Sequence, residues 1–122
     1  RDRTRAVWAV YLGPYCSNGD VQLGVGCGGA IAAVFDLITA NLASLFAGGR
    51  TATATLSVKM SKPVLPIPGL FRVESWIEKE EKGKVHLKAE LSNGNGLVFD
   101  TCEAVLGLPK KAGGNTKAVS KL

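Results

Sequence analysis

The chain has 122 residues, of which 46% are hydrophobic and 20% are charged, a composition that fits one globular domain with a sizeable core. The formal net charge is +5, but four lysines and no acids follow residue 109, so residues 1–109 carry only +1, from 11 basic and 10 acidic residues. A nearly neutral folded part argues against nucleic-acid binding, which needs a basic patch on a structured face. No apolar run approaches the ~18 residues of a membrane span.

The three cysteines, Cys16, Cys27 and Cys102, follow no metal-ligand or disulfide spacing. We therefore expect three free thiols in a reducing compartment and no metal site. The chain begins at Arg1 rather than at a methionine, so N-terminal residues are expected to be missing from it.

The first predicted element is a strand over residues 5–12, which are rich in β-branched and aromatic side chains. Gly13-Pro14-Tyr15 ends this strand, and Ser17-Asn18-Gly19-Asp20 is a turn cluster.

A glycine pair, Gly28-Gly29, opens a helical pattern that continues to Phe46 and ends at Gly48-Gly49. Glycines let the backbone approach a ligand closely, and free N–H groups at a helix N-terminus favour negative charge. At 100° per residue one apolar stripe faces the core. Its members are Ile31, Val34, Phe35, Ile38, Leu42, Leu45 and Phe46.

Asp36 lies off this stripe, about 140° around the helix from Ile31. Its neighbours on that side are alanines: Ala32, Ala33, Ala40 and Ala43. Small residues around one acid favour close approach of a backbone or a ligand. Periodicity alone leaves an ordinary solvated aspartate equally open.

Residues 51–60 alternate polar and apolar side chains, with Leu56 and Val58 on one face and Thr53 on the other, which predicts a half-buried strand. Three prolines, at 63, 66 and 68, then form a stiff connector.

The rest of the predicted domain is three strands, over residues 70–79, 85–91 and 97–108. A charged turn over 79–84 and Asn93-Gly94-Asn95-Gly96 supply the hairpin signals. We predict an α+β fold in which an antiparallel sheet of about five strands, four of them consecutive and joined by hairpin-type turns, wraps around one long central helix.

The predicted domain covers residues 1–109, and residues 110–122 form a flexible basic tail that ends in Ser120-Lys121-Leu122. A terminal Ser-Lys-Leu is an address read by the peroxisomal import receptor. We expect a peroxisome or a related organelle such as the glycosome; a chance match is the alternative.

Four stretches carry a family resemblance: Gly13-Pro14-Tyr15, Gly28-Gly29-Ala30-Ile31-Ala32 with Asp36 following, Thr53-Ala54-Thr55-Leu56-Ser57-Val58, and Lys62-Pro63-Val64. In this order, over residues 6–108, they resemble the hotdog-fold acyl-CoA thioesterases. The branch is that of the phenylacetate-pathway thioesterases and the mammalian thioesterase-superfamily members.

The resemblance implies hydrolysis of an acyl-CoA to free acid and CoA, with no cofactor beyond the CoA of the substrate. It implies that Asp36 is the general base or nucleophile and that the N–H groups of Gly29 and Gly28 polarise the thioester carbonyl. Thr53 would help to position the attacking water; an ordinary strand-forming threonine is the alternative. Family members pair as homodimers or dimers of dimers, with sites across the dimer interface.

Candidates for binding the CoA phosphates are Arg50, Lys59, Lys62 and the tail lysines, with plain solvated charges as the alternative. The family's histidine before the glycine pair is replaced by Cys27. A thiol at a helix N-terminus has a lowered pKa and can be reactive, but a packing or loop role for Cys27 is favoured.

Two other functions stay open. The first is a non-catalytic acyl-CoA-binding protein that lost activity with the change to Cys27. The second is a hotdog hydratase, which usually needs an Asp–His pair near the helix. The single histidine, His86, is expected on the polar face of a strand, which disfavours a hydratase.

Overall fold

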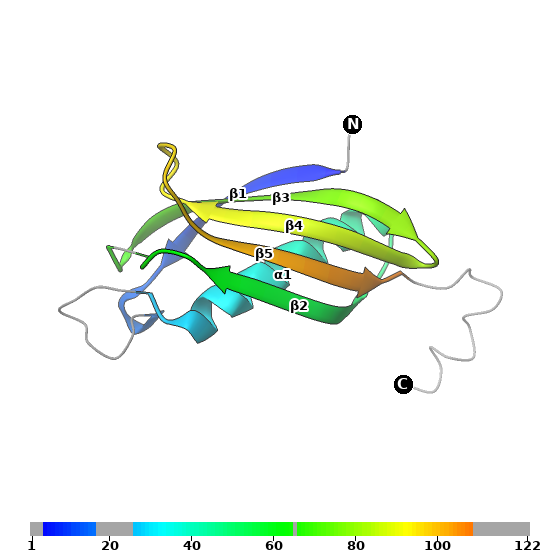
Figure 1. The fold of residues 1–122 in the computed structure, drawn as a ribbon, viewed down its shortest axis with the longest axis horizontal. Helices are drawn as coiled ribbons and strands as arrows, with labels where there is room; N and C mark the ends of the chain where they lie inside the picture. The colour runs from blue at the N-terminus through cyan, green and yellow to red at the C-terminus, as the bar shows by residue number, and fades with distance from the viewer. Residues whose placement is uncertain (1–3, 17–25, 65, 109–122) are drawn as a thin grey trace.

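The computed structural model describes residues 4–16, 26–64 and 66–108. These residues form five strands, one long helix and a short 3-10 helix, η1 (Pro14–Cys16) (Figure 1). The larger elements, in chain order, are β1 (Arg5–Leu12), α1 (Gly28–Ala47), β2 (Ala52–Met60), β3 (Gly69–Glu81), β4 (Lys84–Ser92) and β5 (Val98–Gly107). The turn expected at 17–20 and the tail at 110–122 lie outside the described residues.

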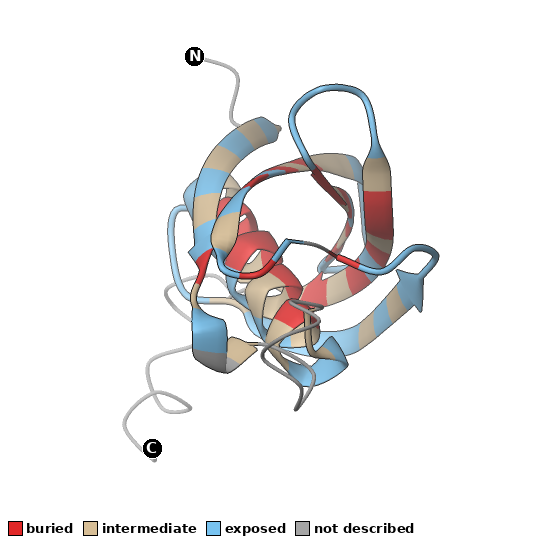
Figure 2. Ribbon diagram, turned by 90° about the vertical axis from the view of Figure 1, so that its left-hand side faces the viewer, coloured by how far each residue is buried: buried red, intermediate tan, exposed pale blue. Residues whose placement is uncertain are grey.

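One antiparallel sheet contains all five strands, in the order β1-β3-β4-β5-β2. It curves around α1, as Figures 1 and 2 show. The predicted α+β class and the helix wrapped by a five-stranded sheet are confirmed. The core lies between the concave face of the sheet and α1, where Phe35 and Leu42 of the helix are buried together with Val73, Leu87 and Leu106 of the strands.

The expectation of four consecutive strands joined by hairpin-type turns is wrong at one connection. β2 pairs with β5 at one edge of the sheet, while β3 pairs with β1 and β4. The connector at 61–68 therefore crosses from one part of the sheet to another. The residues with positive φ angles that tight turns require occur at Lys82-Gly83 and at Gly94 and Gly96, which join the true hairpins β3–β4 and β4–β5.

Helix α1 begins and ends close to the predicted residues. Gly48 adopts a left-handed conformation (φ 74°), and its N–H donates a 2.8 Å hydrogen bond to the carbonyl oxygen of Ser44, which satisfies one of the last carbonyls of the helix. By length and composition alone α1 could cross a membrane. In this fold it is the core helix, with one side buried beneath the sheet (Figure 2).

The buried side of α1 is rotated relative to the predicted stripe. Thr39 and Ala43 are buried, whereas Leu45 is 57% exposed. The buried arc runs from Ile38 to Ala43 around the helix, so Leu45 falls just outside it. Thr39 tolerates burial because its Oγ1 donates a 2.8 Å hydrogen bond to the carbonyl oxygen of Phe35.

Strand β2 is an edge strand and is more exposed than predicted. A bulge between Thr53 and Thr55 interrupts its pairing with β5, and Ala52 and Ala54 are exposed. An edge strand has one neighbour only, and a bulge breaks the alternation of side chains. Leu56 and Val58 are partly buried, so the predicted alternation holds only beyond the bulge.

Candidate active site

Asp36 projects from the third turn of α1 and meets the edge strand β2. Thr53 Oγ1 donates a 2.9 Å hydrogen bond to Asp36 Oδ1. Asp36 is half-buried and Thr53 is exposed. The carboxylate is therefore held by a neighbouring hydroxyl at the surface, and these two predicted site residues are in direct contact.

Asp36 also lies close enough to β5 to influence a thiol there. Cys102 of β5 is 2% exposed, and burial, followed by the negative charges of Asp36 and Glu103, raises the pKa of its thiol to about 12. Cys102 therefore remains a neutral thiol near pH 7. Across the described ranges, no three His, Cys, Asp or Glu side chains converge as metal ligands.

The glycine pair forms the first turn of α1, as predicted. Two backbone hydrogen bonds hold the residues just before the glycine pair. They run from Gly26 N to the carbonyl oxygen of Val64 (2.7 Å) and from Cys27 N to the carbonyl oxygen of Cys16 (2.6 Å). The helix ladder starts with a 3.1 Å bond from Ile31 N to the carbonyl oxygen of Cys27. The N–H groups of residues 28–30 thus have no acceptor within the helix and point out of its positive end.

Cys27 occupies the N-cap of α1. The backbone N–H groups of Ala30 and Gly29 stabilise its thiolate and lower the pKa of the thiol, as the positive end of a helix does for an anion. A Cβ added to Gly29 would lie 3.9 Å from Cys27 Sγ, so the sulfur lies next to the amide that the resemblance assigns to the thioester carbonyl. His86, on β4, faces Lys79 and Val105 across the sheet.

The glycine turn and Asp36 are well separated within one chain. Gly29 and Asp36 lie seven positions apart on one continuous helix, which is about 10 Å along the helix axis. A carbonyl carbon and its oxygen are bonded, so a carbonyl held by Gly29 lies out of reach of the carboxylate of Asp36 in the same chain.

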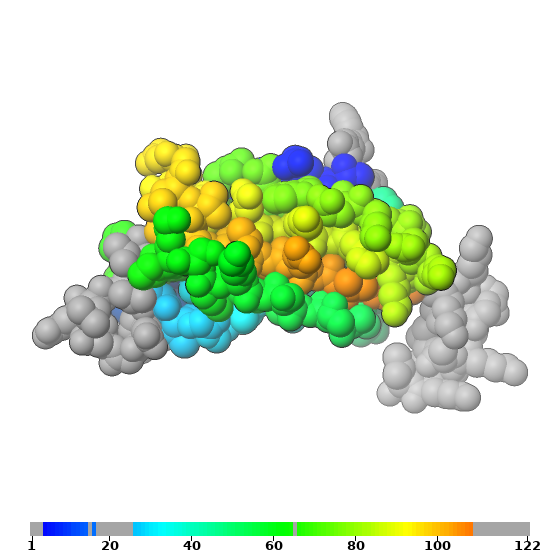
Figure 3. All heavy atoms as spheres, in the orientation of Figure 1, coloured from blue at the N-terminus to red at the C-terminus, as the bar shows by residue number. Residues whose placement is uncertain are grey.

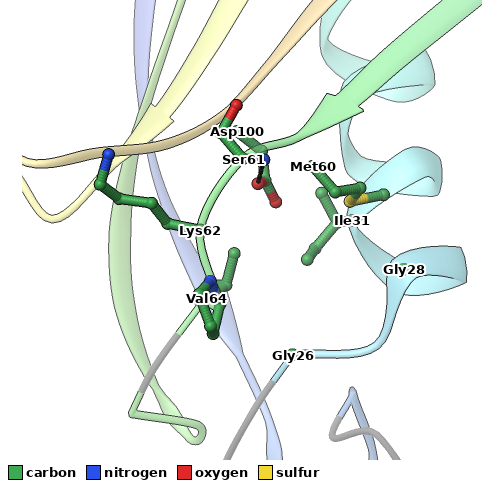
Figure 4. A pocket seen from close by; sticks show the side chains of 9 residues that line it. Gly26, Gly28, Ile31, Met60, Ser61, Lys62, Val64 and Asp100 are labelled. Atoms are coloured by element: carbon green, nitrogen blue, oxygen red, sulfur yellow. Dashed lines mark hydrogen bonds between the residues drawn. The ribbon is translucent and has the colours of Figure 1, made fainter.

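A cavity of about 360 Å³ opens beside the glycine turn (Figure 4). It is lined by Gly26, Gly28, Ile31, Met60, Ser61, Lys62, Pro63, Val64 and Asp100. Asp100 Oδ1 accepts a 3.0 Å hydrogen bond from the backbone N–H of Ser61, and Oδ2 is buried without a partner. Burial raises the pKa of this carboxyl, against the lowering effect of the Ser61 and Lys62 N–H groups.

Asp100 was absent from the predicted site, although the sequence carried a signal. It lies in phase with Cys102, Ala104 and Leu106, which are buried positions of β5. A charged residue at a core-facing strand position is uncommon and marks a functional candidate.

The cations proposed to bind CoA phosphates do not gather at one place in the chain. Arg50 lies after the C-terminal end of α1, in a second cavity of about 530 Å³ shared with Trp8 and Leu45. Lys62 lies past the other end of β2, which has 9 residues and so spans about 30 Å. Lys59 is exposed on β2. The Lys62 ammonium points away from the cavity beside the glycine turn (Figure 4).

Sequence comparison with models of protein families and with curated proteins found no match. Comparison of the folds found similar structures. The chain is similar to a phenylacetic acid degradation-related protein of Ralstonia eutropha JMP134 (TM-score 0.75, 22% identity, 85% of this chain and 76% of that one). It is also similar to a hexameric acyl-CoA thioesterase (TM-score 0.76, 19% identity, 91% and 72%).

The chain has the hotdog fold. An acyl-CoA hydrolase from Staphylococcus aureus, solved with butyryl coenzyme A, coenzyme A and coenzyme A disulfide, shares this fold at TM-score 0.76 and 16% identity, over 89% of this chain. Our hotdog chain spans about two thirds of that protein's length, 65%. At these identities the likeness establishes the architecture alone, because one fold can carry many different functions.

Proposed function

We propose that this hotdog chain hydrolyses acyl-CoA thioesters to a free acid and CoA, with Asp36 as general base or nucleophile. The observation that carries the proposal is the 2.9 Å hydrogen bond from Thr53 Oγ1 to Asp36 Oδ1. It orients one carboxylate oxygen and leaves the other for water or for the thioester carbon. A positioned carboxylate is what a general base or a covalent nucleophile requires.

The second requirement is a site for the negative charge that develops on the carbonyl oxygen. The free N–H groups of the α1 N-terminus, with Gly29 foremost and Gly28 beside it, are the candidates. The lowered pKa of Cys27 supports this assignment, because it reports stabilisation of an anion by these same amides. Such donors typically contribute about 3–4 kcal/mol to lowering the barrier.

We further propose that two copies of the chain complete each site, with Asp36 from one copy and the glycine turn from its partner. The separation of about 10 Å within one helix supports this arrangement. Among the described residues β2 is the last strand at one edge of the sheet, and its atoms lie at the molecular surface (Figure 3). Leu37 and Leu45 of α1 are 63% and 57% exposed. An edge strand and exposed leucines favour a self-complementary contact.

A non-catalytic acyl-CoA-binding protein is the second candidate. It is favoured by the position of Cys27, whose sulfur lies beside the Gly29 amide and competes with a thioester oxygen for it. Arg50, Lys59 and Lys62 remain candidates for the CoA phosphates in either function. The peroxisomal location indicated by Ser120-Lys121-Leu122 also remains a proposal.

The decisive change is Asp36→Asn, assayed for thiol release over a panel of acyl-CoAs. The amide keeps the shape and an acceptor for Thr53 but has neither the charge nor the basicity of a carboxylate. We expect turnover to fall by about 10²–10⁴-fold, the usual contribution of a general base, while the unfolding midpoint stays within a few degrees.

The matched control is Glu80→Gln, which removes an exposed carboxylate at the far end of β3 and should leave turnover unchanged. Full thiol release by the Asp36→Asn variant would exclude Asp36 from the chemistry. Saturable acyl-CoA binding by the wild-type chain without any thiol release would favour the binding protein.

A further inference from the structure

The cavity beside the glycine turn joins the helix end to the interior of the sheet. Gly26 and Gly28 form one border, and the apolar side chains of Ile31, Met60 and Val64 form the walls (Figure 4). Its volume of about 360 Å³ is enough for a short acyl chain and lies within the usual range for ligand pockets. An acyl group whose carbonyl is held at the glycine amides would therefore lie next to this cavity.

One polar side chain interrupts the apolar walls. The carboxylate of Asp100 points into the space between Met60, Ile31 and Val64 (Figure 4). The residue is 1% exposed, and Ser61 N–H binds only Oδ1. Oδ2 has no hydrogen-bond partner.

A buried carboxylate oxygen without a partner is costly, typically 1–3 kcal/mol or more for a charged group. The one cation on the lining, Lys62, points its ammonium away from the cavity (Figure 4) and does not offset the charge. The described part of the cavity thus presents an acceptor that lacks a donor. A purely apolar ligand would fill the walls and leave this acceptor unsatisfied.

We propose that the cavity takes acyl groups whose far end carries a hydrogen-bond donor, either a hydroxyl or a protonated amine, and that Asp100 Oδ2 accepts this donor. This inference rests on the proposed function, since it places the acyl part of the same substrate. Sites built to bind a polar group discriminate strongly against analogues that lack it, because the protein group is then left unpaired. Asp100 is accordingly a specificity-determining residue.

The test compares three acyl-CoAs of equal chain length: hexanoyl-CoA, 6-hydroxyhexanoyl-CoA and 6-aminohexanoyl-CoA. With the full chain, kcat/KM is measured for each, and calorimetry gives the Kd of the matching non-hydrolysable thioether analogues. We expect a preference of about 10- to 100-fold for at least one donor-bearing probe over hexanoyl. The better of the two donor-bearing probes identifies the group that the cavity takes.

Three variants test whether Asp100 is the source of the preference for a donor-bearing probe. Asp100→Leu replaces the carboxylate by an apolar side chain of the same branched shape, removes the acceptor and should abolish the preference. Asp100→Asn keeps a polar group but loses the charge, so the preference for the amino probe should fall most. Thr101→Val, the neighbour on the opposite face of β5, is the matched control and should keep the wild-type preference. Thermal unfolding checks that each variant is folded.

Equal kcat/KM and Kd values of the wild-type chain for the three probes overturn the inference. A folded Asp100→Leu variant that keeps the preference also overturns it. If Asp100→Leu does not fold, an Asp100→Asn variant with an undiminished amino preference overturns it. Hydrolysis of all three probes at equal rates supports the proposed function and overturns the cavity assignment. Asp100-dependent binding of a donor-bearing analogue without hydrolysis supports the cavity assignment and defeats the proposed function. No binding of any analogue defeats the cavity assignment.

Discussion

Cys27 and Cys102 show how the same residue type acquires opposite properties from its surroundings. Cys27 lies at the positive end of a helix, where Ala30 and Gly29 N–H groups lower the pKa of its thiol. Cys102 is buried in β5 near Asp36, and its pKa rises to about 12. The sequence spacing of the cysteines carries no trace of this difference.

This contrast predicts selective alkylation. With iodoacetamide, Cys27 should react fastest, and its rate should reach half-maximum at a pH below the ordinary thiol pKa, because a lowered pKa gives more thiolate at lower pH. Cys102 should stay unmodified in the folded chain throughout this range. Peptide mass spectrometry at a series of pH values measures both rates.

A Cys27→Ser variant, which should lack the fast reaction, is the control. Equal rates at Cys27 and Cys102 would contradict the two environments.

At the scale of elements, the orientation of α1 decides which leucines stabilise the domain. Leu42 is 1% exposed and Leu45 is 57% exposed, although the apolar periodicity placed both on one stripe. The helix turns its Thr39 and Ala43 side toward the sheet instead. Thr39 is polar and Ala43 is small, so the stripe of large apolar residues did not include them.

Leu42→Ala should therefore lower the free energy of unfolding by about 2–5 kcal/mol, because it leaves a cavity in the core. Leu45→Ala should change it by about 0.5 kcal/mol or less within one chain. Urea denaturation at several protein concentrations measures both and separates any contribution from association.

If Leu45→Ala lowered the free energy of unfolding as much as Leu42→Ala, independently of protein concentration, the observed rotation of α1 would be contradicted.

At the scale of the molecule, the proposed site needs two chains, and this can be tested by mixing inactive variants. Gly29→Pro removes the N–H assigned to the thioester oxygen, and proline is tolerated in the first turn of a helix. Asp36→Asn removes the carboxylate. If each site combines Asp36 of one copy with Gly29 of the other, a mixed dimer contains one intact site.

Co-expression of the two variants at equal levels should then restore about a quarter of the wild-type activity, since half of randomly formed dimers are mixed and each has one working site of two. Gly29→Ala is the matched control. It keeps the N–H, its Cβ would meet Cys27 Sγ at an ordinary 3.9 Å, and it should remain active. Co-expressed variants that are no more active than either alone would rule out a shared site.

The helix and the strands could be predicted from the amino-acid sequence, because turn chemistry and side-chain periodicity are local. The 28–47 helix, its glycine ends and the five strands follow from neighbouring residues, as do the β3–β4 and β4–β5 hairpins. The resemblance also selected Asp36 and Thr53, which the fold brings to within a hydrogen bond of each other.

Strand pairing and the burial of polar groups could not be predicted in this way, because they depend on the three-dimensional packing of the chain. The edge position of β2, its bulge beside Thr53 and the crossing connector between β2 and β3 depend on contacts between residues far apart in the chain. The unpartnered oxygen of Asp100 is the sharpest case. Its strand phase could be read from the sequence, but its burial depends on residues far away in the chain, such as Ile31 of α1 and Val64, which line the same cavity.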